Sequence, residues 1–357
     1  MSQRVSPRRR ILQILVMVVM GGGLALGGLW QWWHLQTRPP GGEVVRVEIP
    51  PGTSSRQIGQ WLEEAQIIHS AEAWHWWVRT VGRRWVFQAG IYELDPNLPL
   101  PLIAAQLREG RVLQMAVTIP EGWRIQQMAA ALAEQGWFSA DVFVEAASAV
   151  LQQQPQGLPT NLQSLEGYLF PDTYHLPLLS YGIEAATSQA HLLVEKMLQQ
   201  FVQVALPLYT EADLSRLAVS LSLHEWVTLA SIVEKEAVVP EERRLIAGVF
   251  VNRLQQGIPL GADPTVEYAF NIRQTRERRL TWAEVQRPSP YNTYLNAGLP
   301  PGPIASPGLA SLEATLNPEK TDYLYFVARY DGTHVFSKTL ADHEAAQRQI
   351  IQQQQLP

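Results

Sequence analysis

A motif that occurs twice constrains the fold of this chain more than any other feature of its sequence. It reads VEIPPG at residues 47–52 and VTIPEG at residues 117–122, and each copy precedes apolar residues at helical spacing. Each copy predicts a short strand, a Pro-Gly turn and an amphipathic helix. After the first copy, residues 74–81 predict a second helix and residues 90–94 a second strand. The sequence therefore predicts an α+β protein with a strand–helix–helix–strand unit. Such a unit serves equally well as a structural module or as one that grips substrate.

The composition narrows the class of protein. The chain has 357 residues, of which 46% are hydrophobic and 17% charged, values typical of a folded protein with two or three domains. A net charge of −5 without a basic stripe beyond the N-terminus gives no indication of nucleic-acid binding. The absence of cysteine excludes disulfides, thiol catalysis and cysteine-based metal sites.

The N-terminus carries an arginine cluster, Arg4 and Arg8–Arg10, followed by an uncharged run at residues 11–33. About 20 helical residues span a bilayer, so the run predicts a transmembrane helix, with residues 1–10 cytoplasmic and residues 34–43 as a linker. A cleavable signal peptide is the alternative, but the run is long and lacks an Ala-x-Ala-like site. We expect a single-pass anchor in the plasma (inner) membrane, with the rest of the chain extracytoplasmic.

The most informative candidate for chemistry is the stretch 229–237, LASIVEKEA. At helical spacing, Glu236 lies on the stripe of Leu229, Ile232 and Val233, whereas Glu234 lies roughly opposite. A carboxyl on an apolar face has a raised pKa, which suits a general acid. Glu-Lys-Glu is also a common solvated helix end, so the stretch alone leaves both interpretations open.

Other polar candidates have structural alternatives too. Glu166 and Tyr168 lie among aromatic residues, a pattern typical of a sugar-binding cleft but more often of a buried aromatic corner. Asp263 precedes proline, so it is either functional or part of a turn that begins a helix. No His-Glu-x-x-His, Gly-x-Ser-x-Gly, P-loop or dinucleotide motif is present in the sequence. Carboxylates among aromatics and glycine-rich loops then favour glycoside cleavage without a metal or cofactor.

Seven ordered blocks resemble a known family. They are Glu166–Asp172 (EGYLFPD), Ala230–Glu236 (ASIVEKE), Val249–Leu254 (VFVNRL), Ala262–Val266 (ADPTV), Tyr291–Tyr294 (YNTY), Gly298–Ile304 (GLPPGPI) and Tyr323–Val327 (YLYFV). With these blocks the chain resembles the endolytic murein transglycosylase family (MltG or YceG-like) from its N-terminal run to its last helix. The departures are mild: Gly261-Ala262 precedes the Asp-Pro-Thr step, and the N-terminal module is rich in Trp and Gln.

The resemblance implies the organisation of the chain and the residues of its site. Residues 44–116 are expected to form a LysM-like βααβ module, and residues 117–357 a mixed α/β YceG-like catalytic domain. Glu236 matches the family's catalytic glutamate. The substrate-binding candidates are Glu166, Tyr168, Asp263, Thr265, Tyr291 and Asn292. No metal or cofactor is implied.

The resemblance also implies the reaction. The enzyme would cleave the MurNAc–GlcNAc β-1,4 bond of nascent peptidoglycan strands, leave 1,6-anhydro-MurNAc ends and act as a terminase of glycan elongation. Its partners would be glycan strands, the membrane and peptidoglycan synthases, with no nucleic acid. Two alternatives stay open: a glycoside hydrolase in which Asp263 or Glu166 activates water, and a non-catalytic peptidoglycan-binding scaffold.

Overall fold

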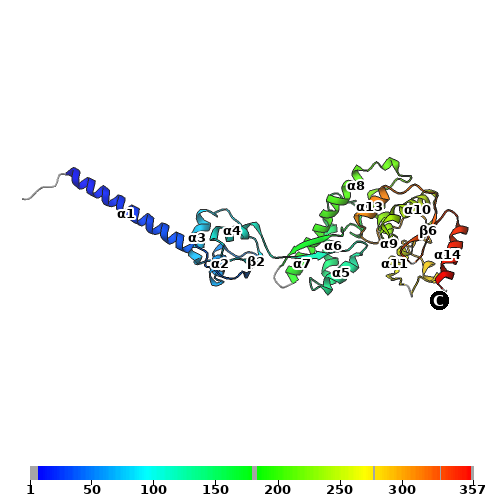
Figure 1. Cartoon of the computed structure of the whole chain (residues 1–357), viewed down its shortest axis with the longest axis horizontal. Helices are drawn as coiled ribbons and strands as arrows, with labels where there is room; N and C mark the ends of the chain where they lie inside the picture. The colour runs from blue at the N-terminus through cyan, green and yellow to red at the C-terminus, as the bar shows by residue number, and fades with distance from the viewer. Residues whose placement is uncertain (1–6, 179–182, 276–277, 330, 355–357) are drawn as a thin grey trace, which may run out of the picture. The chain divides into compact units, whose positions relative to one another are not determined.

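The structure is a computed structural model that describes residues 7–178, 183–275, 278–329 and 331–354 (Figure 1). The chain divides into two compact units: unit 1 comprises residues 1–115 with 177–182, and unit 2 comprises residues 116–176 with 183–357. Arg4 of the predicted cytoplasmic segment lies outside the described residues.

The first helix, α1 (Pro7–Gln36), corrects the expectation of a membrane anchor. Over the part of the chain that the structure describes, no helix combines the length and the apolar character needed to cross a bilayer. The prediction of a transmembrane helix at residues 11–33 was therefore wrong. It relied on the length of the uncharged run, but residues 21–23 and 27–28 are glycines, which add little apolar surface. The helix also continues to Gln36, inside the segment predicted to be a linker.

Unit 1 has the predicted strand–helix–helix–strand order, followed by a further helix. Its elements after α1 are β1 (Val45–Ile49), α2 (Ser55–Glu64), α3 (Ala71–Thr80), β2 (Gly90–Leu94) and α4 (Leu100–Glu109). The two strands are antiparallel, with Val47 opposite Tyr92 and Ile49 opposite Gly90.

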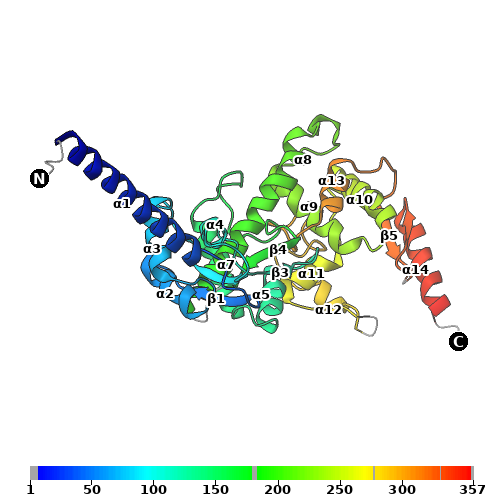
Figure 2. The ribbon, with the colours of Figure 1, turned by 60° about the vertical axis from the view of Figure 1, so that its left-hand side comes forward.

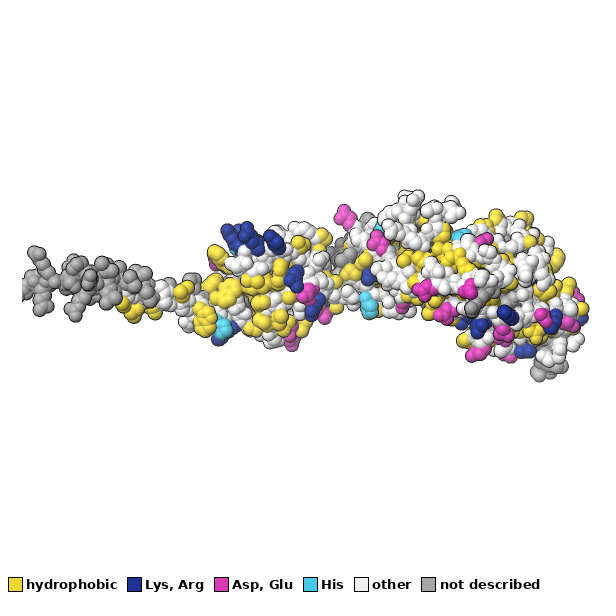
Figure 3. All heavy atoms as spheres, turned by 90° about the horizontal axis from the view of Figure 1, so that it is seen from above, with side chains coloured by type: hydrophobic (Ala, Val, Ile, Leu, Met, Phe, Trp, Pro, Cys, Tyr) yellow, Lys and Arg dark blue, Asp and Glu magenta, His cyan; other side chains and the backbone are white. Residues whose placement is uncertain are grey.

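The core of unit 1 forms around a tryptophan of α3. Trp74 is fully buried and its indole nitrogen donates a hydrogen bond to the carbonyl of Ser55 at 2.8 Å. Gly59 of α2 lies against this ring, where a Cβ would come within 2.5 Å of the indole. Other hydrophobic side chains of unit 1 stay exposed, among them Trp76 and Val86. Figure 3 shows hydrophobic surface on this unit near a group of arginine side chains. A LysM-like module binds glycan, and the same activity for unit 1 stays a prediction.

Unit 2 is mainly helical, with two small two-stranded sheets. Its elements up to the central helix are β3 (Gln114–Thr118), α5 (Ile125–Glu134), α6 (Ala140–Gln152), β4 (Thr173–Pro177), α7 (Ile183–Gln200), a π-helical turn (Phe201–Ala205), α8 (Leu206–Glu211) and a 3₁₀ turn (Leu214–Arg216). Then follow α9 (Leu223–Glu236), a 3₁₀ turn (Pro240–Glu242), α10 (Arg243–Gln256), α11 (Asp263–Phe270), α12 (Trp282–Val285), α13 (Leu309–Leu316), β5 (Tyr325–Ala328), β6 (His334–Ser337) and α14 (Leu340–Gln354).

Helix α9 is the central element of unit 2 and packs against α10, α11 and α13 (Figure 2). Ser222 caps its N-terminus, and Glu225 completes a capping box. Every residue from Trp226 to Val233 is buried, so the helix has core on all sides and not only along the predicted stripe. The Trp226 indole donates to the carbonyl of Leu312 at 3.1 Å, which fixes α9 against α13.

Candidate active site

Glu236 is the last residue of α9, where the helix leaves the core. It forms no hydrogen bond with any residue that the structure describes. Burial, followed by the negative charges of Asp263 and Glu267, raises its pKa to about 8. Part of the residue is accessible to solvent, but the atoms packed around the carboxyl still make its charged form costly. At neutral pH, this carboxyl is therefore mostly protonated.

Three charged groups surround Glu236. Asp263 and Glu267 lie four residues apart on α11, so their side chains share one face of that helix. The Arg253 guanidinium of α10 opposes their effect and lowers the pKa of Glu236. Its nitrogens donate to backbone carbonyls, that of Leu324 through Nε and that of Leu260 through Nη1 at 2.7 Å. Arg253 is thus a fixed positive charge.

Both oxygens of Asp263 are engaged by other side chains. Tyr294 donates its hydroxyl proton to Oδ1 at 2.5 Å, and the Gln274 amide donates to Oδ2 at 3.0 Å. The backbone N–H of Gln274 donates to Oε1 of Glu267 at 2.7 Å. Gln274 therefore holds both acidic residues of α11.

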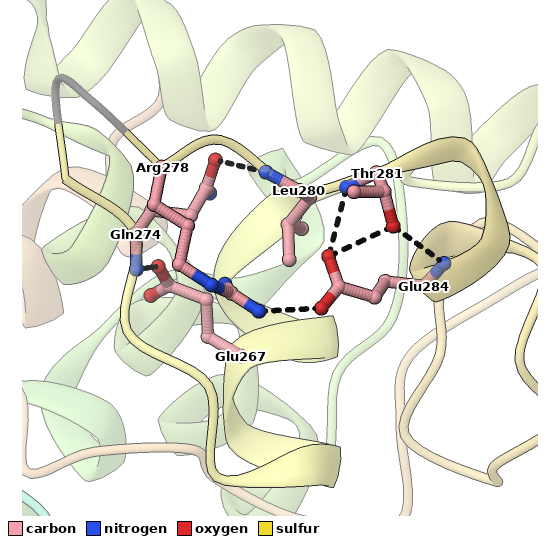
Figure 4. A network of polar contacts seen from close by, with 6 residues as sticks. All are labelled: Glu267, Gln274, Arg278, Leu280, Thr281 and Glu284. Atoms are coloured by element: carbon pink, nitrogen blue, oxygen red, sulfur yellow. Dashed lines mark hydrogen bonds and ion pairs between the residues drawn. The ribbon is translucent and has the colours of Figure 1, made fainter.

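A braced loop carries Gln274. The Leu280 N–H donates to the Gln274 side-chain oxygen at 3.1 Å, and Arg278 pairs with Glu284 at 2.6 Å (Figure 4). Glu284 also accepts from the N–H of Thr281 and so completes the capping box of α12. These contacts hold Gln274 against Leu280 and Arg278 against Glu284.

Glu234, two residues before Glu236 on α9, has a different environment. Its Oε2 accepts hydrogen bonds from the N–H of Gly308 at 3.1 Å and the hydroxyl of Ser311 at 2.6 Å. Gly308 is the N-cap of α13, so the carboxylate lies at the positive end of that helix. Glu234 therefore links α9 to α13.

Glu166 is buried at the start of α5. It accepts from the N–H of Ile125 at 3.0 Å, and burial raises its pKa to about 7 against the opposing effect of this bond and of Arg124. The nearby Tyr268 also lowers the pKa of Glu166. The Tyr268 ring packs against Tyr291, with ring centroids 4.8 Å apart.

Three of the other predicted site residues make structural contacts inside unit 2. Tyr168, Thr265 and Asn292 are fully buried and present no surface to a glycan. The Tyr168 hydroxyl bonds His224 at 3.0 Å, as expected of a buried aromatic corner. The Thr265 hydroxyl donates to the carbonyl of Ala262 at 2.6 Å. Asn292 donates to the carbonyls at residues 285 and 287, so it holds the end of α12. Tyr291 is half-buried.

Four residues of this cluster were not predicted from the sequence: Arg253, Glu267, Gln274 and Tyr294. Two signals existed. Arg253 and Tyr294 belong to blocks that carry the family resemblance, and Glu267 lies one turn after Asp263 on the same helix. Gln274 had no such signal, because only the fold brings the loop back over α11.

A cleft of about 1350 Å³ adjoins this cluster within unit 2. Its walls come from α5, α6, the segment before Tyr168 and the end of α11 with the following loop, and they include Glu166, Lys235 and Glu267. Glu236 is not part of the wall. Glu267 connects the two, because it lines the cleft and lies close enough to Glu236 to raise its pKa.

Metal ligands are not grouped near this cluster. Within the described ranges, no three His, Asp or Glu side chains are arranged to hold a metal ion.

A carboxyl with a raised pKa that lies among charged groups near a cleft is suited to general acid–base catalysis. The family model described as the YceG-like family matches residues 47–349. The chain belongs to this family, and the predicted resemblance is confirmed.

Relatives and a solved structure agree with the family. "Endolytic murein transglycosylase" from Bacillus subtilis (strain 168) is 34% identical over 86% of this chain and 85% of its own length. The protein of that name from Streptococcus pneumoniae serotype 2 (strain D39) is 32% identical over 85% of this chain, which spans 57% of its length. A crystal structure of a yceG-like protein from Listeria monocytogenes is 33% identical, with a TM-score of 0.53, and covers 85% of this chain and 99% of its own.

Proposed function

We propose that this chain is an endolytic murein transglycosylase with Glu236 as its catalytic acid and base. The single observation that carries the proposal is the raised pKa of Glu236, about 8, beside Asp263 and Glu267. The enzyme class follows from the family: the relatives above are endolytic murein transglycosylases by name, and the chain is a lytic transglycosylase.

The reaction begins with proton transfer. Protonated Glu236 donates to the oxygen of the MurNAc–GlcNAc β-1,4 bond, and the departing sugar leaves an oxocarbenium-like MurNAc. The negative charges of Asp263 and Glu267 stabilise this cation electrostatically. The acids that keep Glu236 protonated before the step are thus the ones that favour the charge created by it.

The second half needs no water. Ionised Glu236 removes the proton of the 6-hydroxyl of the same sugar, and that oxygen attacks the anomeric carbon. The bond that forms closes a 1,6-anhydro ring, and the proton returns to Glu236. An internal nucleophile has a high effective molarity, so a second catalytic carboxylate is not required.

Asp263 acts in this scheme through its negative charge and neither donates nor accepts a proton. Both of its oxygens already accept hydrogen bonds, from Tyr294 and Gln274, which hold it in place. A glycoside hydrolase in which Asp263 activates water is the second candidate, because Asp263 is close enough to affect the pKa of Glu236. The products separate the two: 1,6-anhydro ends support transglycosylation, and reducing ends support hydrolysis.

Cleavage inside nascent strands would end their elongation, so we propose a role as a terminase beside peptidoglycan synthases. Murein lies outside the cytoplasmic membrane, and the site would act there. Digestion of purified un-crosslinked strands by the full chain tests the proposal. Internal cuts with anhydro ends support it, whereas no cleavage at all would favour the peptidoglycan-binding scaffold.

A further inference from the structure

Three positively charged side chains line the cleft beside Glu236. Arg124 precedes α5, Lys235 belongs to the last turn of α9, and Arg273 lies on the loop after α11. They come from three separate elements of unit 2, so the fold, and not a local charge run, gathers them. The chain as a whole has a net charge of −5, which makes such a cluster stand out from its average surface.

None of the three cations has an anionic partner at ion-pair distance among the described residues. Lys235 donates to the carbonyl of Gly122 at 3.3 Å, and the Arg124 guanidinium lies 5.2 Å from the centre of the Tyr268 ring. Burial lowers the pKa of both, so part of their hydration is already lost. Arg278, on the same loop as Arg273, is instead paired with Glu284 at 2.6 Å.

Two acids of the cleft accept hydrogen bonds from backbone groups, and Glu267 also attracts Arg124 and Lys235 without forming an ion pair with either. Glu267 accepts from the N–H of Gln274, and Glu166 accepts from the N–H of Ile125. Glu121, also on the wall, packs against Gly308, where an added Cβ would overlap its carboxyl. Among the described residues, the wall therefore offers three cations that lack an anionic partner at ion-pair distance. A partly desolvated cation without a partner costs free energy, and a bound anion offsets that cost.

We propose that this cleft is a subsite for the carboxylates of the peptides attached to the muramic acid residues of the substrate strand. The inference rests on the proposed function, because that function supplies a glycan that carries acidic peptides. Arg124 offers a planar, bidentate donor to a carboxylate, while Lys235 and Arg273 provide charge at the exposed rim. Lys235 directly precedes Glu236, so a peptide held here would fix the strand beside the acid.

The test compares three forms of one un-crosslinked glycan: with its peptides, with the peptide carboxylates converted to amides, and with the peptides removed by an amidase. We expect the wild type to prefer the peptide-bearing form. Arg273→Gln should lower kcat/KM on that form about tenfold, mainly through KM, and leave the other two forms unchanged. Added salt should weaken the wild-type preference, because the rim is exposed. The control is Lys338→Gln, which removes an exposed cation paired with Asp322 at 2.8 Å and should change none of the three rates.

The possible results separate this inference from the proposed function. Equal wild-type rates on all three forms, or an equal loss by Arg273→Gln on all three, would overturn the subsite while cleavage itself persists. A wild-type rate that falls when the peptides are removed, but not when their carboxylates are amidated, would show that peptide contacts other than carboxylates matter. That result would also overturn the subsite. Failure to cleave any form with anhydro ends would count against the proposed function.

Discussion

Glu234 and Glu236 are separated by one residue at the end of α9, yet only Glu234 is held by hydrogen bonds. Gly308 and Ser311 donate to Glu234, whereas no described residue donates to Glu236. Both donors to Glu234 belong to α13 or its N-cap, so this carboxylate links the two helices. The Glu236 carboxyl has no such contact, and its raised pKa, about 8, leaves it protonated near neutral pH.

The first prediction concerns the pH dependence of turnover. The pKa of Glu236 is raised to about 8, so the acid is protonated below that pH and loses its proton above it. We expect kcat to fall as pH rises through about 8, with the slope of one proton. Glu166, whose pKa is raised to about 7, is the control: Glu166→Gln should leave this limb in place. A profile that is flat from pH 6 to 10 would contradict the assignment.

The second prediction concerns Asp263. Its negative charge raises the pKa of Glu236, after burial, so Asp263→Asn should move the alkaline limb of the pH profile roughly one pH unit downward. Asparagine still accepts from Tyr294 through its one oxygen, whereas its amide nitrogen cannot accept from Gln274, so one of the two contacts is lost. Asp322→Asn, on the exposed surface, is the control and should not move the limb. A shift to higher pH would show that Asp263 does not act through its charge.

The third prediction concerns stability. The folded-state pKa of Glu236 lies above its ordinary value of 4.5, so its contribution to stability is fully present below pH 4.5 and is lost as pH rises through about 8. Glu236→Gln lacks this dependence. Its melting temperature relative to the wild type should therefore increase from pH 5 to pH 9. An unchanged difference across that range would mean that the carboxyl is not desolvated in the folded state.

The fourth prediction concerns Glu234. Glu234→Ala removes the acceptor of two hydrogen bonds at the N-terminus of α13, and should lower the free energy of unfolding by about 2 kcal/mol. Denaturant titration of the full chain, followed by tryptophan fluorescence, measures the loss in the free energy of unfolding. Glu241→Ala, at an exposed position before α10, should change the free energy by less than about 0.5 kcal/mol. Equal effects of the two would remove the structural role of Glu234.

Sequence periodicity predicted the local elements around the site but not the contacts that distinguish its residues. The spacing of Leu229, Ile232 and Val233 correctly placed α9 in the core. That Glu234 is held by Gly308 and Ser311 could not be predicted, since those residues lie more than 70 positions downstream. Long-range hydrogen bonds leave no periodic signal.

Two other outcomes have similar causes. The aromatic segment around Tyr168 left a sugar-binding cleft and a buried corner open, and burial alone separates them: Tyr168 is inaccessible, and the Tyr174 hydroxyl donates to the carbonyl of Phe170. The run at residues 11–33 was judged by its length, although its glycines contribute little apolar surface. In both cases, residue type was known but the surface that each residue presents was not.

The most direct test of the central claim is mass spectrometry of the products from the wild type, Glu236→Gln and Glu234→Gln on purified glycan strands. We expect 1,6-anhydro ends from the wild type and from Glu234→Gln, which keeps an oxygen to accept from Gly308. Glu236→Gln should be slower by about 10²–10⁴-fold, because glutamine cannot donate the proton. Substantial activity of Glu236→Gln beside a folded but inactive Glu234→Gln would contradict the account, as would reducing ends from the wild type.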